Sequence, residues 1–138
     1  MQSPRPDAPV ILIADRDQTV RELQRFFLDR AGYAVEFADD GEAALERARA
    51  APPALVVTEI LIPKIDGLAL CRRLREDPAT AGVPVIVFSI LSAAPRAAEA
   101  GASAFLRKPL VESVFVAAVN DLVAAQPTEA MEEQCRSR

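Results

Sequence analysis

The sequence predicts an α/β protein in which five parallel strands are each followed by a helix. Short apolar runs rich in β-branched residues, which are typical of strands buried on both faces, alternate with segments of helical apolar spacing. Such alternation implies right-handed crossovers and a doubly wound sheet covered by helices on both faces. We therefore expect a single (βα)5 domain over residues 9–126, between an N-terminal tail, 1–8, and a polar C-terminal tail, 127–138.

The first half of the chain shows two strands and two helices. Val10–Ala14 has the composition of a buried strand, and Asp17 then has the position of an N-cap for a helix that ends at Gly32. The apolar stripe expected on this helix comprises Val20, Leu23, Phe27 and Ala31. A second strand, Ala34–Ala38, precedes a helix that is opened by Asp39, Asp40 and Gly41. The core residues expected on that helix are Ala44, Leu45 and Ala48.

The second half repeats the alternation. Two further apolar strands are Ala54–Glu59 and Pro84–Ser89, and between them a loop at Pro63–Gly67 leads into a third helix. The core residues expected there are Leu68, Cys71 and Leu74. A helix of only about two turns is expected from about Pro95 to Ala100, before the last strand, Ala104–Leu106. The final helix carries the clearest apolar stripe: Val111, Val114, Phe115, Ala118, Val119, Leu122 and Val123.

Composition excludes several classes of function. The net charge of −4 and the pI near 4.9 argue against a nucleic-acid-binding surface, which needs a basic face. No apolar run is long enough to span a bilayer, and the N-terminus lacks the apolar core of a secretory signal, so we expect a cytoplasmic protein. Cys71 and Cys135 are then expected to be reduced thiols. The absence of histidine excludes a histidine phosphotransfer role.

Polar residues follow four of the expected strands at their carboxyl ends. These residues are Asp15, Arg16, Glu59, Ser89 and Lys108. In a doubly wound sheet the functional crevice lies at this edge, near the switch in strand order. With the strand order 2-1-3-4-5, we expect these side chains to converge on one site.

Four segments, in order, resemble those of a bacterial response-regulator receiver domain. The segments are Ile11–Asp17, Leu55–Gly67, Pro84–Ser89 and Gly101–Pro109. The resemblance implies a flavodoxin-like receiver fold and phosphoryl transfer from a histidine kinase to an aspartate, with Mg²⁺ held by three carboxylates. It also implies that the lysine at 108 and a hydroxyl at 89 bind phosphoryl oxygens. By the same resemblance, Ser89 is the switch hydroxyl, Phe105 the switch aromatic, and Lys108-Pro109 a cis peptide bond.

The sequence departs from this family pattern at two positions. Glu59 stands at the phosphoacceptor position, and its extra methylene moves the carboxylate by more than the tolerance of about 0.5 Å for a productive site. Arg16 stands at the second acidic position, where a metal ligand has become a cation. Two carboxylates, Asp15 and Glu59, and two cations, Arg16 and Lys108, then sum to zero charge. We therefore expect Mg²⁺ binding to be weak or absent, with Asp15 at most as a ligand, unless Asp17 points inward instead of capping its helix.

These residues favour a stand-alone, non-enzymatic receiver-like module that is not phosphorylated by the normal aspartyl mechanism. We expect it to act by contact with a protein partner, either a histidine kinase or a downstream signalling protein, as a monomer or weak dimer. Glu59 either mimics a phosphorylated aspartate or is a relic paired with Lys108 or Arg16. One alternative is a working phosphorelay receiver that uses Glu59 or Asp17 weakly. Another is a flavodoxin-like ligand-binding domain, which needs a glycine-rich phosphate loop where this chain has Asp15–Gln18.

Overall fold

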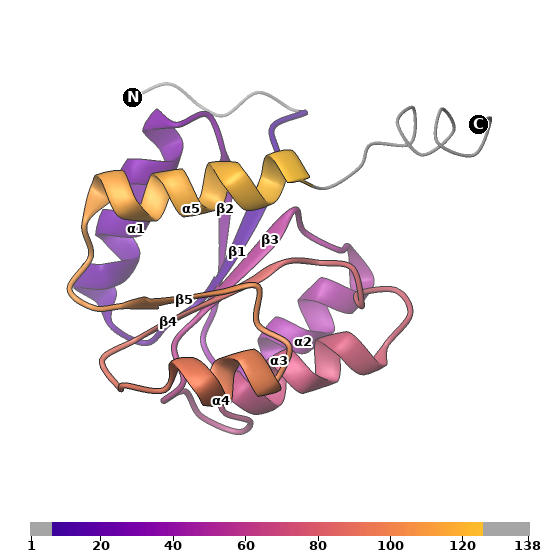
Figure 1. Cartoon of the computed structure of the whole chain (residues 1–138). Coiled ribbons are helices and arrows are strands. Elements are labelled where there is room, and N and C mark those ends of the chain that lie inside the picture. The colour runs from indigo at the N-terminus through magenta and orange to yellow at the C-terminus, as the bar shows by residue number, and fades with distance from the viewer. Residues whose placement is uncertain (1–6, 126–138) are drawn as a thin grey trace.

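The computed structural model describes residues 7–125, in which strands and helices alternate from one end to the other (Figure 1). The strands are β1 (Val10–Ala14), β2 (Ala34–Ala38), β3 (Leu55–Thr58), β4 (Val85–Ser89) and β5 (Ala104–Arg107). The helices are α1 (Gln18–Arg30), α2 (Gly41–Ala50), α3 (Gly67–Glu76), α4 (Ala94–Glu99) and α5 (Glu112–Ala125). The expected tails, apart from Asp7 and Ala8, lie outside the described residues, as does Cys135.

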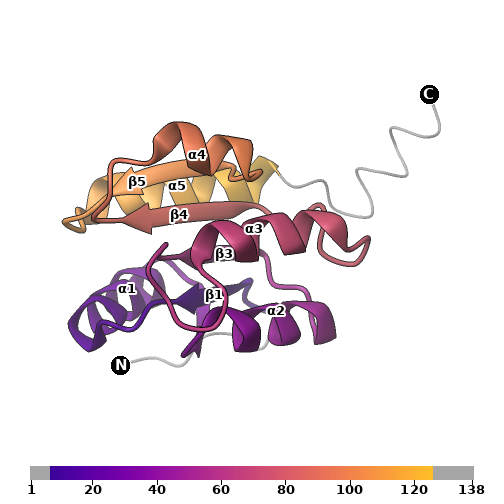
Figure 2. The same ribbon diagram turned by 90° about the horizontal axis from the view of Figure 1, so that it is seen from below.

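The strands form one parallel sheet in the order β2-β1-β3-β4-β5, so the predicted fold class and strand order are confirmed. Helices α1 and α5 lie on one face of the sheet, and α2, α3 and α4 lie on the other (Figures 1 and 2). All five strands therefore end at the same edge. Within residues 7–125, every helix is too short or too polar to cross a membrane.

The core consists of two apolar layers, because successive residues of a strand point to opposite faces of the sheet. In β1, Ile11 and Ile13 pack with Leu28 of α1 and with α5, whereas Leu12 and Ala14 pack with α2, α3 and α4. The core residues expected on α2 and α3 are all buried, and among the described residues Cys71 is a free, buried thiol. Each layer is continuous, so the sheet is a rigid base for the loops at its carboxyl edge.

The buried side of α1 differs from the stripe expected from the sequence. The fully buried side chains of α1 are Gln24 and Leu28, whereas Leu23 is 42% exposed and Ala31 is exposed. Both polar atoms of the Gln24 side chain lack a hydrogen-bond partner. Val20 and Phe27 pack against the core as expected, so the predicted stripe was wrong only at Leu23 and Ala31. Apolar character alone ranked Leu23 above Gln24, whereas the packing of α1 on the sheet places Gln24 inward.

The beginning of α5 also differs from the prediction. Phe115 and Val119 are buried as expected, but Val111 and Val114 are 52% and 53% exposed. Val111 precedes the helix, which begins at Glu112. Other boundaries differ by one residue: β3 ends at Thr58, and α3 includes Gly67, because Asp66 accepts a hydrogen bond from the Ala69 amide and caps the helix. The short α4, with its proline in the first turn, is confirmed.

Candidate functional site

The side chains of Asp15, Glu59, Ser89 and Lys108 converge at the carboxyl edge of the sheet. The Lys108 Nζ atom lies 2.9 Å from Oδ2 of Asp15 and 3.0 Å from Oε2 of Glu59. All four side chains are largely buried, with Ser89 fully so. We call these four residues the acid–lysine cluster. The topology alone places them here, because they follow or end β1, β3, β4 and β5.

Both carboxylate oxygens of Glu59 are occupied. Oε1 accepts hydrogen bonds from the backbone N–H of Ile60, at 2.6 Å, and of Leu61, at 3.3 Å. The hydroxyl of Ser89 donates a short hydrogen bond to the same oxygen. Oε2 faces the Lys108 ammonium. The side chain of Glu59, which is longer than that of an aspartate, therefore lies over the loop that follows β3 and accepts hydrogen bonds from the backbone of that loop.

These contacts shift the pKa values of the paired groups in opposite directions. Burial raises the pKa of Glu59, but the hydrogen bonds from Ser89, Lys108 and the Ile60 amide outweigh it, so the pKa lies below the usual value of glutamate. Burial lowers the pKa of Lys108, but the hydrogen bonds to Asp15 and Glu59 outweigh it, and the pKa of Lys108 is raised. The pair is therefore charged at neutral pH, as a buried ion pair requires.

The residues that follow β1 lie outside the cluster. Asp17 caps α1, because its carboxylate accepts hydrogen bonds from the amides of Thr19 and Val20. The alternative in which Asp17 points into the site is not the arrangement seen here. Arg16 is exposed and forms no ion pair within residues 7–125, so of the two partners considered for Glu59, Lys108 is the one that pairs with it. Lys108 alone supplies the cation between the carboxylates.

Arg21 is a residue that the sequence did not single out. Its Nε atom donates a short hydrogen bond to the backbone carbonyl of Asp15. Its Nη2 atom donates to the carbonyl of Ala38 at 2.8 Å and lies 3.0 Å from Oδ1 of Asp39. Arg21 thus ties the carboxyl ends of β1 and β2 together and fixes the backbone that carries Asp15. The sequence signals this role of Arg21 only by placing a cation one helical turn after Asp17, the cap of α1.

The remaining positions of the resemblance lie beside the cluster. The peptide bond between Lys108 and Pro109 is cis, as the resemblance implied. Phe105 is half-buried and packs against the core layer on the side of α2, α3 and α4. The Lys108 amide donates a backbone hydrogen bond to the Ser89 carbonyl at 2.9 Å, which joins the two strands that carry the hydroxyl and the ammonium group.

The arrangement does not fit a divalent metal ion. Asp15 Oδ2 faces Lys108, and its Oδ1 accepts a hydrogen bond from the Asp17 amide at 2.9 Å. Glu59 is held by the four groups described above. Arg16 offers no oxygen ligand. Mg²⁺ needs oxygen ligands in octahedral geometry, and here the two carboxylates already have donors and a cation between them.

Comparison with known proteins identifies the family. The model of the response regulator receiver domain matches residues 11–120. The chain belongs to the response regulator receiver domain family. A receiver domain is a signalling module of two-component systems, so this part of the functional prediction is confirmed. The flavodoxin-like ligand-binding alternative is not supported.

The sequence relatives are bacterial response regulators. The chain is 34% identical over 118 residues to the DNA-binding dual master transcriptional regulator RpaA of Synechocystis, covering 83% of this chain and 49% of the relative. It is 35% identical over 131 residues to the response regulator MprA of Mycobacterium leprae, covering 92% and 57%. The chain thus spans about half the length of the curated relatives it matches.

Solved structures agree with this assignment. A response regulator from Chloroflexus aurantiacus is 35% identical with a TM-score of 0.82, over 86% of this chain and 99% of that one. The receiver domain of a signal transduction histidine kinase from Syntrophus aciditrophicus is 33% identical with a TM-score of 0.81, over 88% and 96%. The observed fold is therefore that of the family.

Proposed function

We propose that this receiver domain acts by protein contact and independently of phosphorylation at the phosphoacceptor position. The observation that carries the proposal is the set of contacts of Glu59. Its carboxylate already binds the ammonium of Lys108 and the hydroxyl of Ser89, which are the groups that the family pattern assigns to the phosphoryl oxygens. A phosphoryl group would have to displace Glu59 from both.

The nucleophile is also poorly placed for attack. A carboxylate oxygen that attacks phosphorus needs a lone pair directed at the donor, with the reacting atoms about 3 to 3.5 Å apart. Glu59 is 6% exposed, and both of its oxygens accept hydrogen bonds or face Lys108. The site also offers Mg²⁺ few ligands, because Asp15 and Glu59 are held by Lys108 and the side chain of Arg16 has no oxygen.

Glu59 is more than a counter-ion of Lys108 in this proposal. Its hydrogen bonds with Ser89 and with two backbone amides of the following loop hold the same elements that a phosphoryl group would hold. This favours the interpretation in which Glu59 takes over part of the phosphoryl group's structural role. The carboxylate carries less charge and fewer oxygens than a phosphate, so the match is to position and not to charge.

The test is incubation of the purified protein with acetyl phosphate and Mg²⁺, followed by intact mass spectrometry. We expect no gain of the mass of a phosphoryl group. A stoichiometric gain that maps to Glu59 or Asp17 would contradict the proposal and would support the working phosphorelay receiver instead.

A further inference from the structure

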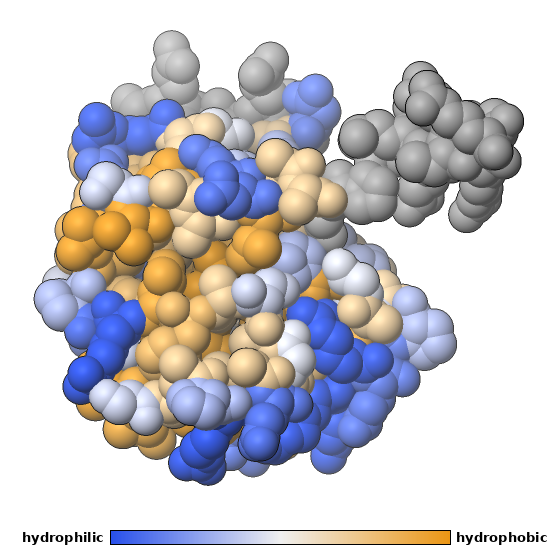
Figure 3. All heavy atoms as spheres, in the orientation of Figure 1, coloured by the Kyte–Doolittle hydropathy of each residue, from blue (hydrophilic) through white to orange (hydrophobic). Residues whose placement is uncertain are grey.

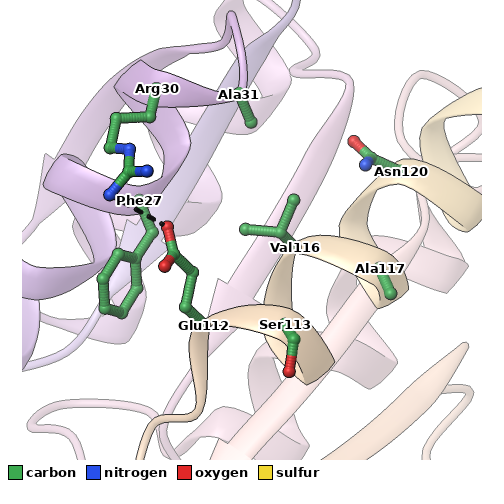
Figure 4. A pocket seen from close by; sticks show the side chains of 8 residues that line it. All are labelled: Phe27, Arg30, Ala31, Glu112, Ser113, Val116, Ala117 and Asn120. Carbon is green, nitrogen blue, oxygen red and sulfur yellow. Dashed lines mark ion pairs between the residues drawn. The ribbon is translucent and has the colours of Figure 1, made fainter.

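A cleft of about 520 Å³ lies between the end of α1 and the first turns of α5 (Figure 4). Its floor is apolar: Phe27 and Val116 are half-buried, and Ala31 and Ala117 also line it. On the face seen in Figure 3, apolar atoms predominate over α5, whereas hydrophilic atoms gather over α2 and α3. No segment within residues 7–125 fills the cleft, so its apolar floor is left uncovered by the described chain.

Hydrogen-bond donors lie at both ends of the cleft. At the start of α5, Nη1 of Arg30 lies 3.6 Å from a carboxylate oxygen of Glu112, and the Arg30 side chain is 61% exposed. A guanidinium has five N–H donors, so Arg30 can bind a second carboxylate. About two turns further along α5, Oδ1 of Asn120 accepts a hydrogen bond from the Tyr33 hydroxyl at 2.5 Å, which leaves the amide N–H donors for another acceptor. The cleft therefore fits an apolar side chain that is flanked by carboxylates.

The segment that follows α5 carries this pattern in its sequence. Glu129–Glu133 has the sequence Glu-Ala-Met-Glu-Glu, in which an apolar pair is flanked by carboxylates. Arg136 follows three residues later and would supply a cation for Glu112. These residues lie outside the described part of the chain, which ends with α5 at Ala125. Pro127 lacks the backbone N–H that a longer helix would use, and proline is common in turns, so the sequence allows the chain to reverse after α5.

The spacing of the carboxylates in this segment matches the length of the cleft. Along α5, Asn120 lies about 12 Å from Glu112, at a rise of 1.5 Å per residue. In an extended chain, Glu129 and Glu133 are about 13 Å apart. The stretch from Ala125 to Glu129 spans up to about 13 Å, whereas Asn120 lies only about 7.5 Å back along the helix. The segment is therefore long enough to return to the cleft and to lie along it.

A small contact area is sufficient for a segment that belongs to the same chain. A cleft of this size contacts only a few side chains, and interfaces that small are weak between separate proteins. A segment joined to its binding site by a short linker has an effective concentration in the millimolar range. The chain itself is therefore a better occupant of the cleft than a separate protein.

We propose that the segment Glu129–Glu133 folds back along α5 and binds in the cleft between α1 and α5. Met131 packs on the apolar floor, the first carboxylate of the segment accepts hydrogen bonds from Asn120, and the last pairs with Arg30. The bound segment covers the apolar floor, so a protein partner that contacts this face has to displace it. The inference goes beyond the proposed function and does not depend on it, because none of these contacts involves Glu59.

The test places a nitroxide spin label on Cys135, two residues after the proposed segment, in the full-length chain. Cys71 is fully buried, and burial raises the pKa of its thiol, so labelling should be confined to Cys135. Amide peak intensities in NMR are compared with the label oxidised and reduced. We expect the loss of intensity to fall on the end of α1 and the first turns of α5, with Ala31 and Val116 among the affected amides. A segment that does not bind would instead affect the end of α5, around Ala125.

Substitutions test the contacts. Arg30→Glu should remove the loss of intensity at the cleft, and additional replacement of Glu132 and Glu133 by arginine should restore it. Met131→Ser, which leaves residues 7–125 unchanged, should also weaken the loss. The matched control is Arg72→Glu, at an exposed arginine of α3 that forms no ion pair within residues 7–125. This control should keep the loss of intensity at the cleft.

A mixed sample tests whether the segment comes from the same molecule. Isotope-labelled protein with Cys135→Ser is combined with spin-labelled protein that carries no isotope label. We expect no loss of intensity in the mixture, because the segment and the cleft belong to one chain. Loss at the cleft in the mixture, no loss at the cleft in the single sample, or a loss that Arg30→Glu leaves unchanged would overturn the proposal.

Discussion

The ammonium group of Lys108 lies 3.0 Å from Oε2 of Glu59 and 2.9 Å from Oδ2 of Asp15, so one buried cation serves two buried carboxylates. The formal charge of the three groups is −1, from two carboxylates and one ammonium. The cost of burying them is offset only while all three are present, because each carboxylate depends on the same partner. The stability of this edge of the sheet should therefore depend strongly on Lys108.

Replacement of Lys108 by methionine keeps the length of the side chain and removes its charge. We expect the free energy of unfolding at pH 7 to fall by about 3 to 5 kcal/mol, because two buried carboxylates lose their cation. Urea denaturation measures this change. The matched control is Lys64→Met, since Lys64 pairs with Asp40 with its side chain 58% exposed, and such pairs contribute about 1 kcal/mol or less. If the two substitutions lowered the free energy of unfolding equally, the buried cluster would contribute no more to stability than an exposed ion pair.

The pKa of Glu59 predicts how stability depends on acid. Because this pKa is lower in the folded protein, the stabilisation from ionised Glu59 is fully present above the ordinary glutamate pKa of about 4.3, and it is lost as the pH falls through the folded value. Between pH 7 and pH 3 the wild type should therefore lose more stability than Glu59→Gln. Urea denaturation of both proteins across this range measures the difference. Parallel curves would mean that Glu59 does not titrate as the contacts require.

The buried, unpaired amide of Gln24 indicates that replacing this residue should stabilise the protein. Its amide is fully buried in α1, and neither polar atom has a partner. Gln24→Met keeps a similar shape and removes both unsatisfied atoms, so we expect the free energy of unfolding to rise by about 1 to 3 kcal/mol. Gln18→Met, at an exposed position of the same helix, should change it by less than about 0.5 kcal/mol. A loss of stability in Gln24→Met would show that the amide finds a partner in solution.

The occupied carboxylates predict that Mg²⁺ does not bind at the cluster. Titration to millimolar Mg²⁺, followed by amide chemical shifts in NMR, should give no saturable change at Asp15 or Glu59. Fluorescence is a poor probe here because the chain has no tryptophan. A saturable shift at the Asp15 amide together with that of Asp17 would mean that Asp17 leaves its capping position to serve as a ligand.

The fold was accessible from the sequence because the apolar patterns are local. The buried strands, the cap at Asp17 and the glycine after α1 are each signalled within a few residues. The residues that open α2 were also recognised, although Asp40 was not singled out as its cap. The burial of the Gln24 side chain and the exposure of the Val114 side chain were not predicted. They depend on how α1 and α5 rotate against the sheet, which is set by packing with residues far away in the chain.

Four of the five residues expected at the candidate site lie there, whereas Arg16 does not, and the contacts within the site were not predicted. Topology brings Asp15, Glu59, Ser89 and Lys108 together, so strand ends were enough to find them. The backbone donors to Glu59 depend on the loop after β3, and no residue type signals them. Arg16 was expected to add a second cation to the site, yet its side chain is exposed. Arg16 instead reduces the number of carboxylates that could bind Mg²⁺, since it stands where the family pattern has an acidic residue.

We propose that Glu59 and Arg16, which stand where the family pattern has carboxylates, together abolish phosphorylation at the phosphoacceptor position. Glu59→Asp alone restores the shorter nucleophile, but position 16 still lacks a carboxylate. Arg16→Asp alone restores a ligand, but Glu59 still occupies Lys108 and Ser89. Only the double variant has nucleophile, ligand and lysine together, so the effects should be strongly non-additive, as for groups that act as a unit.

The measurement is phosphoryl incorporation from acetyl phosphate with Mg²⁺, followed by intact mass for the wild type, both single variants and the double variant. We expect the mass of one phosphoryl group to appear on the double variant alone. Labelling of Glu59→Asp at the rate of the double variant would show that Arg16 is a bystander, and labelling of the wild type would contradict the claim itself.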